Sequence, residues 1–397
     1  MEQRYSSVRS LVANLRPEKP LHIYRPRAVE EAAQYFLNNF NGRVLYAVKT
    51  NPDRQVLKHL YSLGITSFDV ASLHEVRTVH ELLPDAELFF MHTVKSRAAI
   101  RSAYFEYGVR SFSLDSDEEL YKILAETDNA TDLNLFVRLA IPNTYAEMNL
   151  ADKFGVNLTE AAELLELTRA NARRLGVCFH VGSQCMHSDA YRIAMRMAKQ
   201  VIDASGVTVD SLDVGGGYPS IYPGMNPPAI HTYLDAIEEE FSALYGDMEM
   251  ELMCEPGRAL VAESGAVIVR VDLRKGQNLY INDGTYGSLF DAGQPKFIFP
   301  VRLIRPNAPH STGLMPFSFF GPTCDTLDFM KGPFYLPEDI SEGDYIEIGQ
   351  LGAYGRTLGT SFNGFTPEDG TPWVDEAPLM SMYGAHVEAP EVLEIAA

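Results

Sequence analysis

The stretch VLYAVKTNPDRQVLKHLYSLGITSFDVAS, residues 44–72, contains two apolar segments separated by one amphipathic segment. The segments that begin at Val44 and Ser67 are nearly continuous apolar runs, which is typical of parallel strands buried on both faces. Between them, residues 53–64 carry apolar side chains at helical spacing. The stretch therefore predicts a strand–helix–strand unit. It places Lys49 at the end of the first strand, where a buried charge needs a partner.

The same alternation continues along the chain. Apolar, strand-like segments begin at Val44, Ser67, Leu88, Ser111, Leu135, Val177, Leu212 and Leu252. Segments of helical period precede the first of them and lie between the others. Eight strands alternating with helices predict an α/β fold, a (β/α)8 barrel of the TIM type. A doubly wound open sheet is the alternative that this pattern leaves open.

The character of the chain changes after Gly265. Strand-like segments punctuated by Gly and Pro follow, among them AVIVRVDLRKG, NLYINDG, FIFPVRLI and GDYIEIGQLGAYG. We therefore expect a barrel over residues 25–265 and a β-sandwich or β-barrel domain formed by residues 1–24 and 266–397. From about Asn363 onward the chain is rich in Pro, Glu and Asp, and we expect a surface extension with a frayed tail.

The net charge of the chain limits the kinds of molecule that it is expected to bind. The 397 residues carry a formal net charge of -20, which argues against binding to nucleic acid or to an anionic membrane surface. A small cationic substrate suits such a field, whereas acidity that only keeps the protein in solution is the plain alternative. The four cysteines lack metal-type spacing, so free thiols and no metal site are expected.

The N-terminus gives an expectation about location. Its first 20 residues contain no apolar signal core, and no apolar run approaches the roughly 18 residues that span a bilayer. We therefore expect a cytoplasmic protein that does not enter a membrane.

Polar side chains and glycines gather where the predicted strands end. In chain order they are Lys49, Asp69, His92, Arg138, His180, the glycines after Val214, and Glu255. Active sites of (β/α)8 barrels lie at the C-terminal ends of the strands. The set is therefore a candidate active site, although any single member could instead have a satisfied structural role.

Two motifs at the last strands indicate the kind of ligand. GGGYP, from Gly215, offers several backbone N–H groups to an anion, as a phosphate cradle does, although a tight turn uses glycine equally. EPGR, from Glu255 to Arg258, adds an acid and a guanidinium. A lysine, a carboxylate and a phosphate cradle together fit pyridoxal 5'-phosphate (PLP). In that case the partner of Lys49 is the cofactor aldehyde, held as a Schiff base.

These motifs carry a resemblance to a known family. The chain resembles the PLP-dependent basic amino acid decarboxylases, a group with an alanine-racemase-like barrel that includes ornithine decarboxylase. The resemblance extends from about Tyr24 to Phe365. It is carried by YAVKTN, FDVAS, HVGSQ, DVGGGYP, CEPGRALV, NDGTYGS, GPTCDTLD and GAYGRTLGTSFNGF.

The resemblance implies roles for residues in the cofactor site. Lys49 would be the Schiff-base lysine, Glu255 the partner of the pyridinium nitrogen, and His180 the residue that stacks on the cofactor ring. Asp69 and Arg138 would support the cofactor side of the pocket. The phosphate would be bound by Ser183, the glycines Gly215, Gly216 and Gly217, Arg258 and Tyr354.

The resemblance also implies how substrate is bound and protonated. Cys324 would come from the partner subunit and donate a proton to Cα, so that a head-to-tail homodimer shares its two sites. Asp325 would bind the distal cation of a small diamino acid, because a buried unpaired acid disfavours neutral substrates. Asp291 would be a second distal acid, and Tyr286 would line the pocket.

The implied activity is decarboxylation of L-ornithine to putrescine and CO2, a reaction of polyamine biosynthesis. L-Lysine, which gives cadaverine, stays open as a second substrate. Diaminopimelate decarboxylases carry Glu after the cysteine, and arginine decarboxylases of this family are usually much longer. A racemase would place Arg, rather than Glu255, against the ring nitrogen. A non-catalytic binding relative would be expected to lose Lys49, the glycines or Cys324, and AVKTNP lacks the glycine loop of a Rossmann dehydrogenase.

Overall fold

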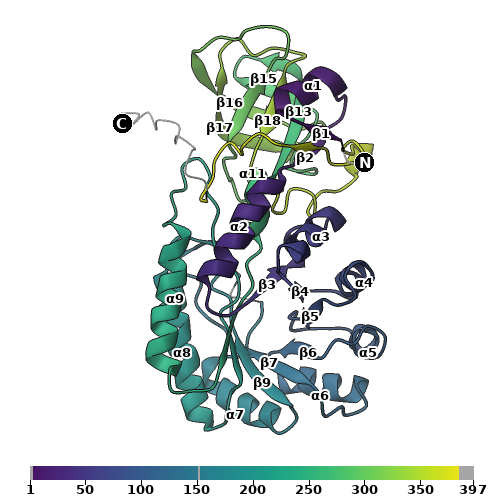
Figure 1. Cartoon of the computed structure of the whole chain (residues 1–397). Coiled ribbons are helices and arrows are strands. Elements are labelled where there is room, and N and C mark those ends of the chain that lie inside the picture. The colour runs from purple at the N-terminus through teal and green to yellow at the C-terminus, as the bar shows by residue number, and fades with distance from the viewer. Residues whose placement is uncertain (1–2, 151–152, 384–397) are drawn as a thin grey trace. The chain divides into compact units, whose positions relative to one another are not determined.

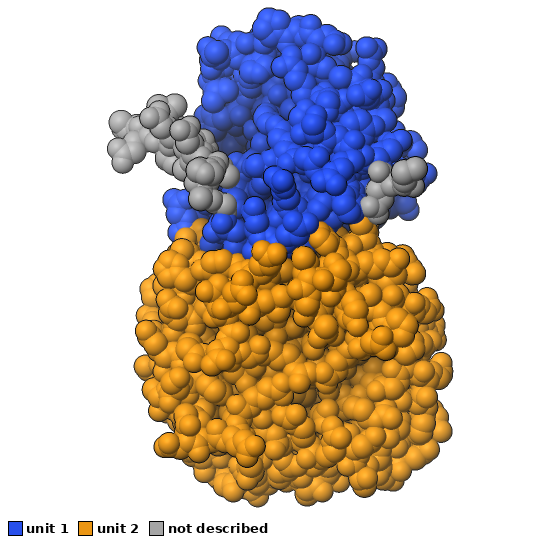
Figure 2. Space-filling view, in the orientation of Figure 1, with its two compact units in different colours: residues 1–32, 220–226, 261–397 blue, residues 33–219, 227–260 orange. Residues whose placement is uncertain are grey.

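The structure is a computed structural model that describes residues 3–150 and 153–383. The chain divides into two compact units, which are coloured separately in Figure 2. One, the β unit, consists of residues 1–32, 220–226 and 261–397, and the other, the barrel unit, consists of residues 33–219 and 227–260. The sequence places the expected boundary between the barrel and the β domain at residue 265, and that boundary stays a prediction. No helix among the described residues is long and apolar enough to cross a membrane.

A closed barrel of eight parallel strands forms the centre of the barrel unit, in the order β11-β12-β3-β4-β5-β6-β7-β9. The strands are β3 (Arg43–Ala47), β4 (Ser67–Val70), β5 (Glu87–Phe90), β6 (Ser111–Leu114), β7 (Asn134–Arg138), β9 (Arg174–Cys178), β11 (Ser211–Asp213) and β12 (Glu251–Cys254). The pairing of β12 with β3 closes the ring. The predicted (β/α)8 barrel is confirmed, and the open sheet is excluded.

Helices precede, connect and follow these strands, and those between the strands lie outside the barrel, as Figure 1 shows. They are α2 (Pro26–Asn39), α3 (Arg54–Ser62), α4 (Leu73–Leu82), α5 (Arg97–Phe105), α6 (Asp117–Glu126), α7 (Leu158–Arg169), α8 (Asp189–Ser205), α9 (Ile230–Tyr245) and the short α10 (Arg258–Val261). The hydroxyls of Ser72, Ser96 and Ser116 each accept a backbone N–H of the helix that follows, so these helices start at fixed points just after a strand. A 3-10 turn, η1 (Val48–Thr50), follows β3, and a short ribbon pairs β8 (Ala146–Met148) with β10 (Ser183–Cys185).

The barrel interior is filled with side chains. Six buried residues form one cluster: Leu45, Phe89, Met91, Phe136, Cys178 and Met253. Gly176 leaves room for the ring of Phe136, because a Cβ at this glycine would lie 2.2 Å from Cδ1 of Phe136. The interior is therefore a packed core, and polar side chains from the strands are available for chemistry only at the ends of the barrel.

A nine-stranded sheet forms the described part of the β unit. Its strands are β1 (Arg4–Tyr5), β2 (Leu21–Tyr24), β13 (Gly265–Lys275), β14 (Asn278–Ile281), β15 (Val301–Ile304), β16 (Leu314–Phe320), β17 (Phe329–Pro337), β18 (Tyr345–Ile348) and β19 (Trp373–Val374). Its helical segments are α1 (Val8–Leu15), η2 (Ala262–Ser264), α11 (Phe290–Gly293) and η3 (Phe362–Gly364). The two ends of the chain meet in this sheet, since β2 pairs antiparallel with β13 and parallel with β19.

The segment after Asn363 differs from the expected surface extension. Trp373 and Val374 pair with β1, and Trp373 also pairs with Tyr24. The expected surface position holds for residues 363–370, which are exposed except for the half-buried Glu368, but it was wrong for Trp373 and Val374. The acidic and Pro-rich flanks hide a two-residue strand whose Val374 is 1% exposed. The predicted frayed tail falls on residues 384–397, which lie outside the described residues.

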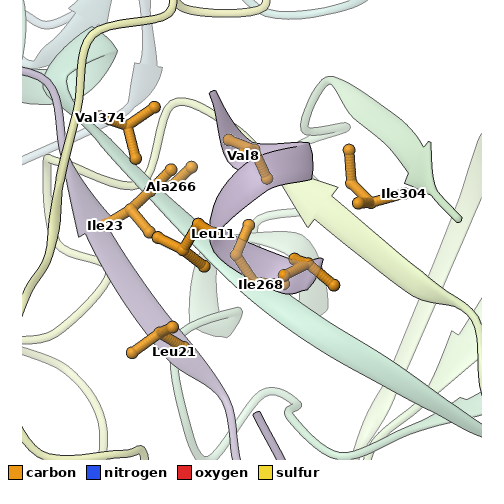
Figure 3. Packing of buried hydrophobic residues seen from close by; sticks show 9 residues of the cluster. Val8, Leu11, Leu21, Ile23, Ala266, Ile268, Ile304 and Val374 are labelled. Atoms are coloured by element: carbon orange, nitrogen blue, oxygen red, sulfur yellow. The ribbon is translucent and has the colours of Figure 1, made fainter. Parts of the chain in front are cut away.

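Buried side chains from α1 and several strands form one cluster, shown in Figure 3. Its members are Val8, Leu11, Val12, Leu21, Ile23, Ala266, Ile268, Ile304 and Val374. Removing apolar surface from water stabilises the folded state by roughly 25 cal/mol per Å². Because this cluster joins side chains of α1 and β2 to side chains of β13, β15 and β19, its burial holds the first residues of the chain against these later strands.

A buried ion-pair network lies in the same unit. Glu347 is 0% exposed and accepts from the guanidinium of Arg25, which is 1% exposed. Its second oxygen accepts from Nε and Nη2 of Arg302, at 3.0 and 2.6 Å. Removing the carboxylate would leave a buried guanidinium without its counter-charge.

We predict that Glu347→Ala lowers the free energy of unfolding of the β unit by about 3–5 kcal/mol, because breaking a buried pair leaves an uncompensated charge. Denaturant unfolding of the purified variant measures this change. Asp375→Asn is the matched control in the same unit, since its pair with Arg4 is exposed and should contribute little. Equal effects of the two substitutions would contradict the prediction.

Candidate active site

Lys49 and Asp69 form the first part of the candidate site. Lys49 lies in η1, directly after β3, and Asp69 lies near the end of the neighbouring strand β4. Lys49 Nζ is 2.7 Å from Asp69 Oδ2, and the lysine side chain is 42% exposed whereas that of Asp69 is 3% exposed. Asp69 thus supplies the counter-charge in this structure, while the amine stays accessible for chemistry.

His180 follows β9 and is held by both its ring and its backbone. Its Nδ1 accepts from the N–H of Gly182 at 3.0 Å, and its carbonyl accepts from the Asn143 amide at 2.8 Å. The loss of water around the ring, together with the charges of Arg138 and Lys49, lowers the pKa of His180 to about 3. The imidazole is therefore neutral at ordinary pH, which suits stacking on a cofactor ring better than donating a proton.

The glycines after β11 bring backbone close to the neighbouring strand ends. Gly215 and Gly217 have φ angles of +70° and +102°, which L side chains rarely adopt. A Cβ at Gly216 would lie 2.7 Å from the carbonyl oxygen of Glu255 and 3.2 Å from Nε2 of His180. A Cβ at Gly217 would lie 2.5 Å from the Gly182 carbonyl oxygen. Only a loop without side chains fits here.

Ser183 and Arg258 complete this end of the site. Arg258 Nη2 lies 3.4 Å from Ser183 Oγ, and the arginine is 4% exposed. Ser183 follows Gly182, whose carbonyl oxygen would lie 2.5 Å from a Cβ at Gly217, so Ser183 is close to the glycine loop. A guanidinium, a hydroxyl and a glycine loop without side chains form a donor set that fits a phosphate group. The residues predicted to bind the cofactor phosphate from the barrel unit are thus brought together.

Two carboxyl groups lie at the barrel rim beside the glycine loop. Glu255 follows β12 and Asp213 ends β11, and these are paired strands. Burial and the nearby Asp213 raise the pKa of Glu255 well above its usual range, and burial raises the pKa of Asp213 to about 6. Glu255 was predicted from the sequence, whereas Asp213 was missed. The signal for it is present, because Asp213 is a polar residue at a strand end in the motif DVGGGYP.

Arg138 and His92 also lie at strand ends. Arg138 ends β7, and its guanidinium carbon is 5.5 Å from the centroid of the Phe154 ring. His92 meets the same ring edge-on, with the two centroids 5.1 Å apart. Both side chains are half-buried. The charge of Arg138 reaches His180, whose pKa it helps to lower.

The remaining predicted residues lie in the β unit, and three of them form a cluster. Tyr286 Oη donates to Asp325 Oδ2 at 2.5 Å, and the N–H of Leu327 together with this bond lowers the pKa of Asp325. Cys324 is exposed, whereas the other three cysteines are buried free thiols. The backbone N–H of Cys324 donates to Asn363 Oδ1 at 3.2 Å, a contact that sequence reasoning missed.

Asp291 and Tyr354 have different surroundings. Asp291 lies in α11 and is 6% exposed, whereas Asp325 is half-buried. Tyr354 is half-buried and has a φ of +62°. Their predicted roles, in the distal acid pair and at the phosphate, stay predictions. Among the described residues there is no group of three or more His, Cys, Asp or Glu side chains that could hold a metal ion.

Known proteins resemble this chain over most of its length. Residues 27–262 match the family described as "Pyridoxal-dependent decarboxylase, pyridoxal binding domain". A lysine/ornithine decarboxylase of Selenomonas ruminantium is 31% identical over 348 residues, covering 85% of each chain. An ornithine decarboxylase of Panagrellus redivivus is 32% identical over 380 residues, covering 87% of this chain and 83% of the relative.

Solved structures agree with the sequence comparisons. A crystal structure of a mutant SrLDC in complex with PLP superposes with a TM-score of 0.81 at 26% identity, covering 94% of this chain and 96% of the other. The resemblance inferred from the motifs, its fold and its cofactor are therefore confirmed.

We predict that His180→Phe reduces the acid sensitivity of the barrel unit. The folded-state pKa of His180 is about 3 and its ordinary value is 6.5, so between these values the unfolded chain binds more protons and stability falls as the pH falls. The slope of unfolding free energy against pH, measured by urea unfolding, should decrease in this window by up to about 1.4 kcal/mol per pH unit. His310→Phe is the control, because it removes an exposed histidine and should leave the slope nearly unchanged. An unchanged slope for His180→Phe would contradict the assignment.

Proposed function

Because this chain belongs to the family of pyridoxal-dependent decarboxylases, we propose that it converts L-ornithine to putrescine and CO2, with L-lysine, which gives cadaverine, as a second substrate. The observation that carries the substrate assignment is the carboxylate of Asp325, which is held by Tyr286 and kept ionised by the hydrogen bonds it accepts. A fixed anion beside the predicted proton donor suits a substrate with a distal ammonium group.

Four residues of the barrel rim hold the aldehyde and ring of the cofactor in this proposal. PLP, when bound, supplies an electron sink for the bond that loses CO2. Lys49 offers an accessible amine for the cofactor aldehyde, and Asp69 orients that amine at 2.7 Å. Glu255 provides the acid for the ring nitrogen. His180 provides a neutral face for the ring.

The phosphate has its own set of residues. In this proposal Arg258, Ser183 and the loop Gly215–Gly217 of the barrel unit bind it. Arg138 supports the cofactor side of the pocket through its charge. The proposed set therefore contains both an acid for the ring nitrogen and donors for the phosphate.

Cys324 is the proposed proton donor to Cα after CO2 leaves. Its thiol is exposed, and its backbone is fixed by Asn363. We infer that Cys324 acts in the site of a partner subunit, so that the protein works as a homodimer with shared sites. Asp325 then binds the distal ammonium of substrate in that site, with Tyr286 beside it and Asp291 as a second acid. In a cell, this activity would serve polyamine biosynthesis in the cytoplasm.

Other activities of the same family are the alternatives. A diaminopimelate substrate carries a second carboxylate, which Asp325 would repel. Arginine has a larger, planar distal cation, which a carboxylate can also bind. A non-catalytic relative that acts only by binding partners would not need an accessible lysine beside a buried acid.

The test is an assay of the purified protein with PLP and, separately, L-ornithine, L-lysine, L-arginine and meso-diaminopimelate, scoring CO2 and the amine product. We expect putrescine from ornithine, with cadaverine from lysine weaker or comparable. Lys49→Ala is the inactive control, since it removes the amine. Lysine produced from diaminopimelate would overturn the assignment of Asp325, and no CO2 from any substrate would overturn the enzymatic function.

We predict that Asp325→Asn raises the KM for L-ornithine by about tenfold or more, because a charge-assisted hydrogen bond to the distal ammonium is lost. The dissociation constant of PLP should change little, since Asp325 lies in the substrate part of the proposed site. Steady-state kinetics and cofactor titration measure the two quantities. Asp272→Asn, an exposed acid in the same unit, is the matched control. An unchanged KM for Asp325→Asn would refute its role.

A further inference from the structure

Asn143 is a buried side chain in the loop that follows β7, and its neighbours in that loop are exposed. Pro142, Thr144 and Tyr145 face solvent, whereas Asn143 is 7% exposed. A polar side chain that is buried in this way needs hydrogen-bond partners, and those partners limit its conformation. None of the sequence motifs quoted above includes Asn143, so its contacts are a feature of the tertiary structure alone.

The amide group of Asn143 uses both its nitrogen and its oxygen. Nδ2 donates to the carbonyl oxygen of His180 at 2.8 Å and to that of Ile141 at 3.1 Å. Oδ1 accepts from the backbone N–H of Leu150 at 2.8 Å. The reverse orientation would set the amide oxygen against two carbonyl oxygens and the amide NH2 against an N–H, so these contacts fix the orientation. A carboxylate, which only accepts, could not replace the amide.

His180 lies just beyond the strand pairing that holds β9 in the barrel. β9 ends at Cys178, and the next N–H, that of Phe179, donates to the carbonyl of Asp213 on the neighbouring strand at 3.2 Å. One residue further, the carbonyl of His180 accepts from the side chain of Asn143. The amide of Asn143 therefore holds the backbone at a point where the barrel strands no longer do so.

The ring of His180 is fixed by the backbone that follows it. Its Nδ1 accepts from the N–H of Gly182 at 3.0 Å. A Cβ at Gly182 would lie 3.1 Å from Oδ1 of Asn143, so the amide also adjoins the residue that holds the ring. A Cβ at Gly216 would lie 3.2 Å from Nε2 of His180, so the glycine loop adjoins the same ring. The direction of the ring thus depends on the backbone from His180 to Gly182, which Asn143 contacts.

We propose that Asn143 is a positioning residue that holds His180 in the orientation needed to stack on the ring of PLP. The inference rests on the proposed stacking role of His180. Two flat rings make full contact only when they are close to parallel, and a supporting side chain must hold such a geometry within narrow limits. Asn143 acts through the backbone of His180 in this proposal, so its effect should disappear when the imidazole is absent.

The experiment is a double-mutant cycle in the full-length protein. It compares the unsubstituted protein, Asn143→Ala, His180→Ala and the protein that carries both substitutions. Titration of the cofactor-free proteins gives the dissociation constant of PLP, and the circular dichroism of its visible band reports the asymmetry of its surroundings. Neither measurement uses a substrate, so the result is independent of which amino acid the protein decarboxylates.

We expect Asn143→Ala to weaken PLP binding by about tenfold and to reduce the visible circular dichroism, because a buried carbonyl loses its donor and His180 is no longer fixed. In the His180→Ala protein the same substitution should change the dissociation constant by less than about twofold, since the two residues act as a unit. An equal loss in both backgrounds would indicate a general structural role and overturn the proposal. Unchanged binding by Asn143→Ala, or by His180→Ala, would also overturn it, the latter by removing its premise.

A second variant keeps the outcome decisive should Asn143→Ala fail to fold. Asn143→Asp keeps the size of the side chain and the acceptor for Leu150, but its carboxylate has no donor for the His180 carbonyl. We expect it to weaken PLP binding at least as much as Asn143→Ala, and binding equal to that of the unsubstituted protein would overturn the proposal. Asn134→Asp is the matched control, because Asn134 begins β7 at the opposite end of the barrel, where its Nδ2 donates to Ser111 Oγ at 3.2 Å. It should leave PLP binding nearly unchanged.

Discussion

Closure of eight parallel strands into one barrel is the constraint on which the candidate site depends. Because every strand runs in the same direction, all their C-terminal ends meet at one rim, and residues far apart in the chain become neighbours there. The packed side chains of the barrel interior leave no room for polar groups to withdraw inward. Lys49, Asp69, His180, Asp213 and Glu255 are therefore held at the rim with few conformations open to them.

Burial away from water then shifts the pKa values of ionisable side chains at this rim. Lys49 is paired with Asp69, His180 is neutral because burial and two nearby cations disfavour its protonated form, and burial raises the pKa of the acids Asp213 and Glu255. The same rim also carries hydrogen-bond donors, in Arg258 and the glycine loop. A cofactor that has both a basic ring nitrogen and a phosphate matches this combination of acids and donors.

The β unit contributes different chemistry by different means. Cys324 and Asp325 lie on the loop between β16 and β17. Their positions are therefore fixed by hydrogen bonds and not by strand pairing. Tyr286 holds Asp325, and Asn363 holds the backbone of Cys324. The unit itself depends on pairing between the first and last parts of the chain, since β2 lies between β13 and β19. Substrate chemistry in this proposal thus depends on contacts that are distant in sequence.

The sequence by itself determined the barrel, the cofactor and most of the candidate residues, because buried parallel strands leave a continuous apolar signal and the motifs YAVK, GGGYP and EPGR mark their ends. It did not indicate β19, because two residues carry no periodicity, nor the contacts of Asn143 and Asn363, because a side-chain amide that binds distant backbone leaves no pattern. Only the tertiary structure decided that Asp213 and Glu255 lie at neighbouring strand ends and that burial raises the pKa of both. A charge state depends on burial and on neighbours in space, and neither can be read from the order of residues along the chain.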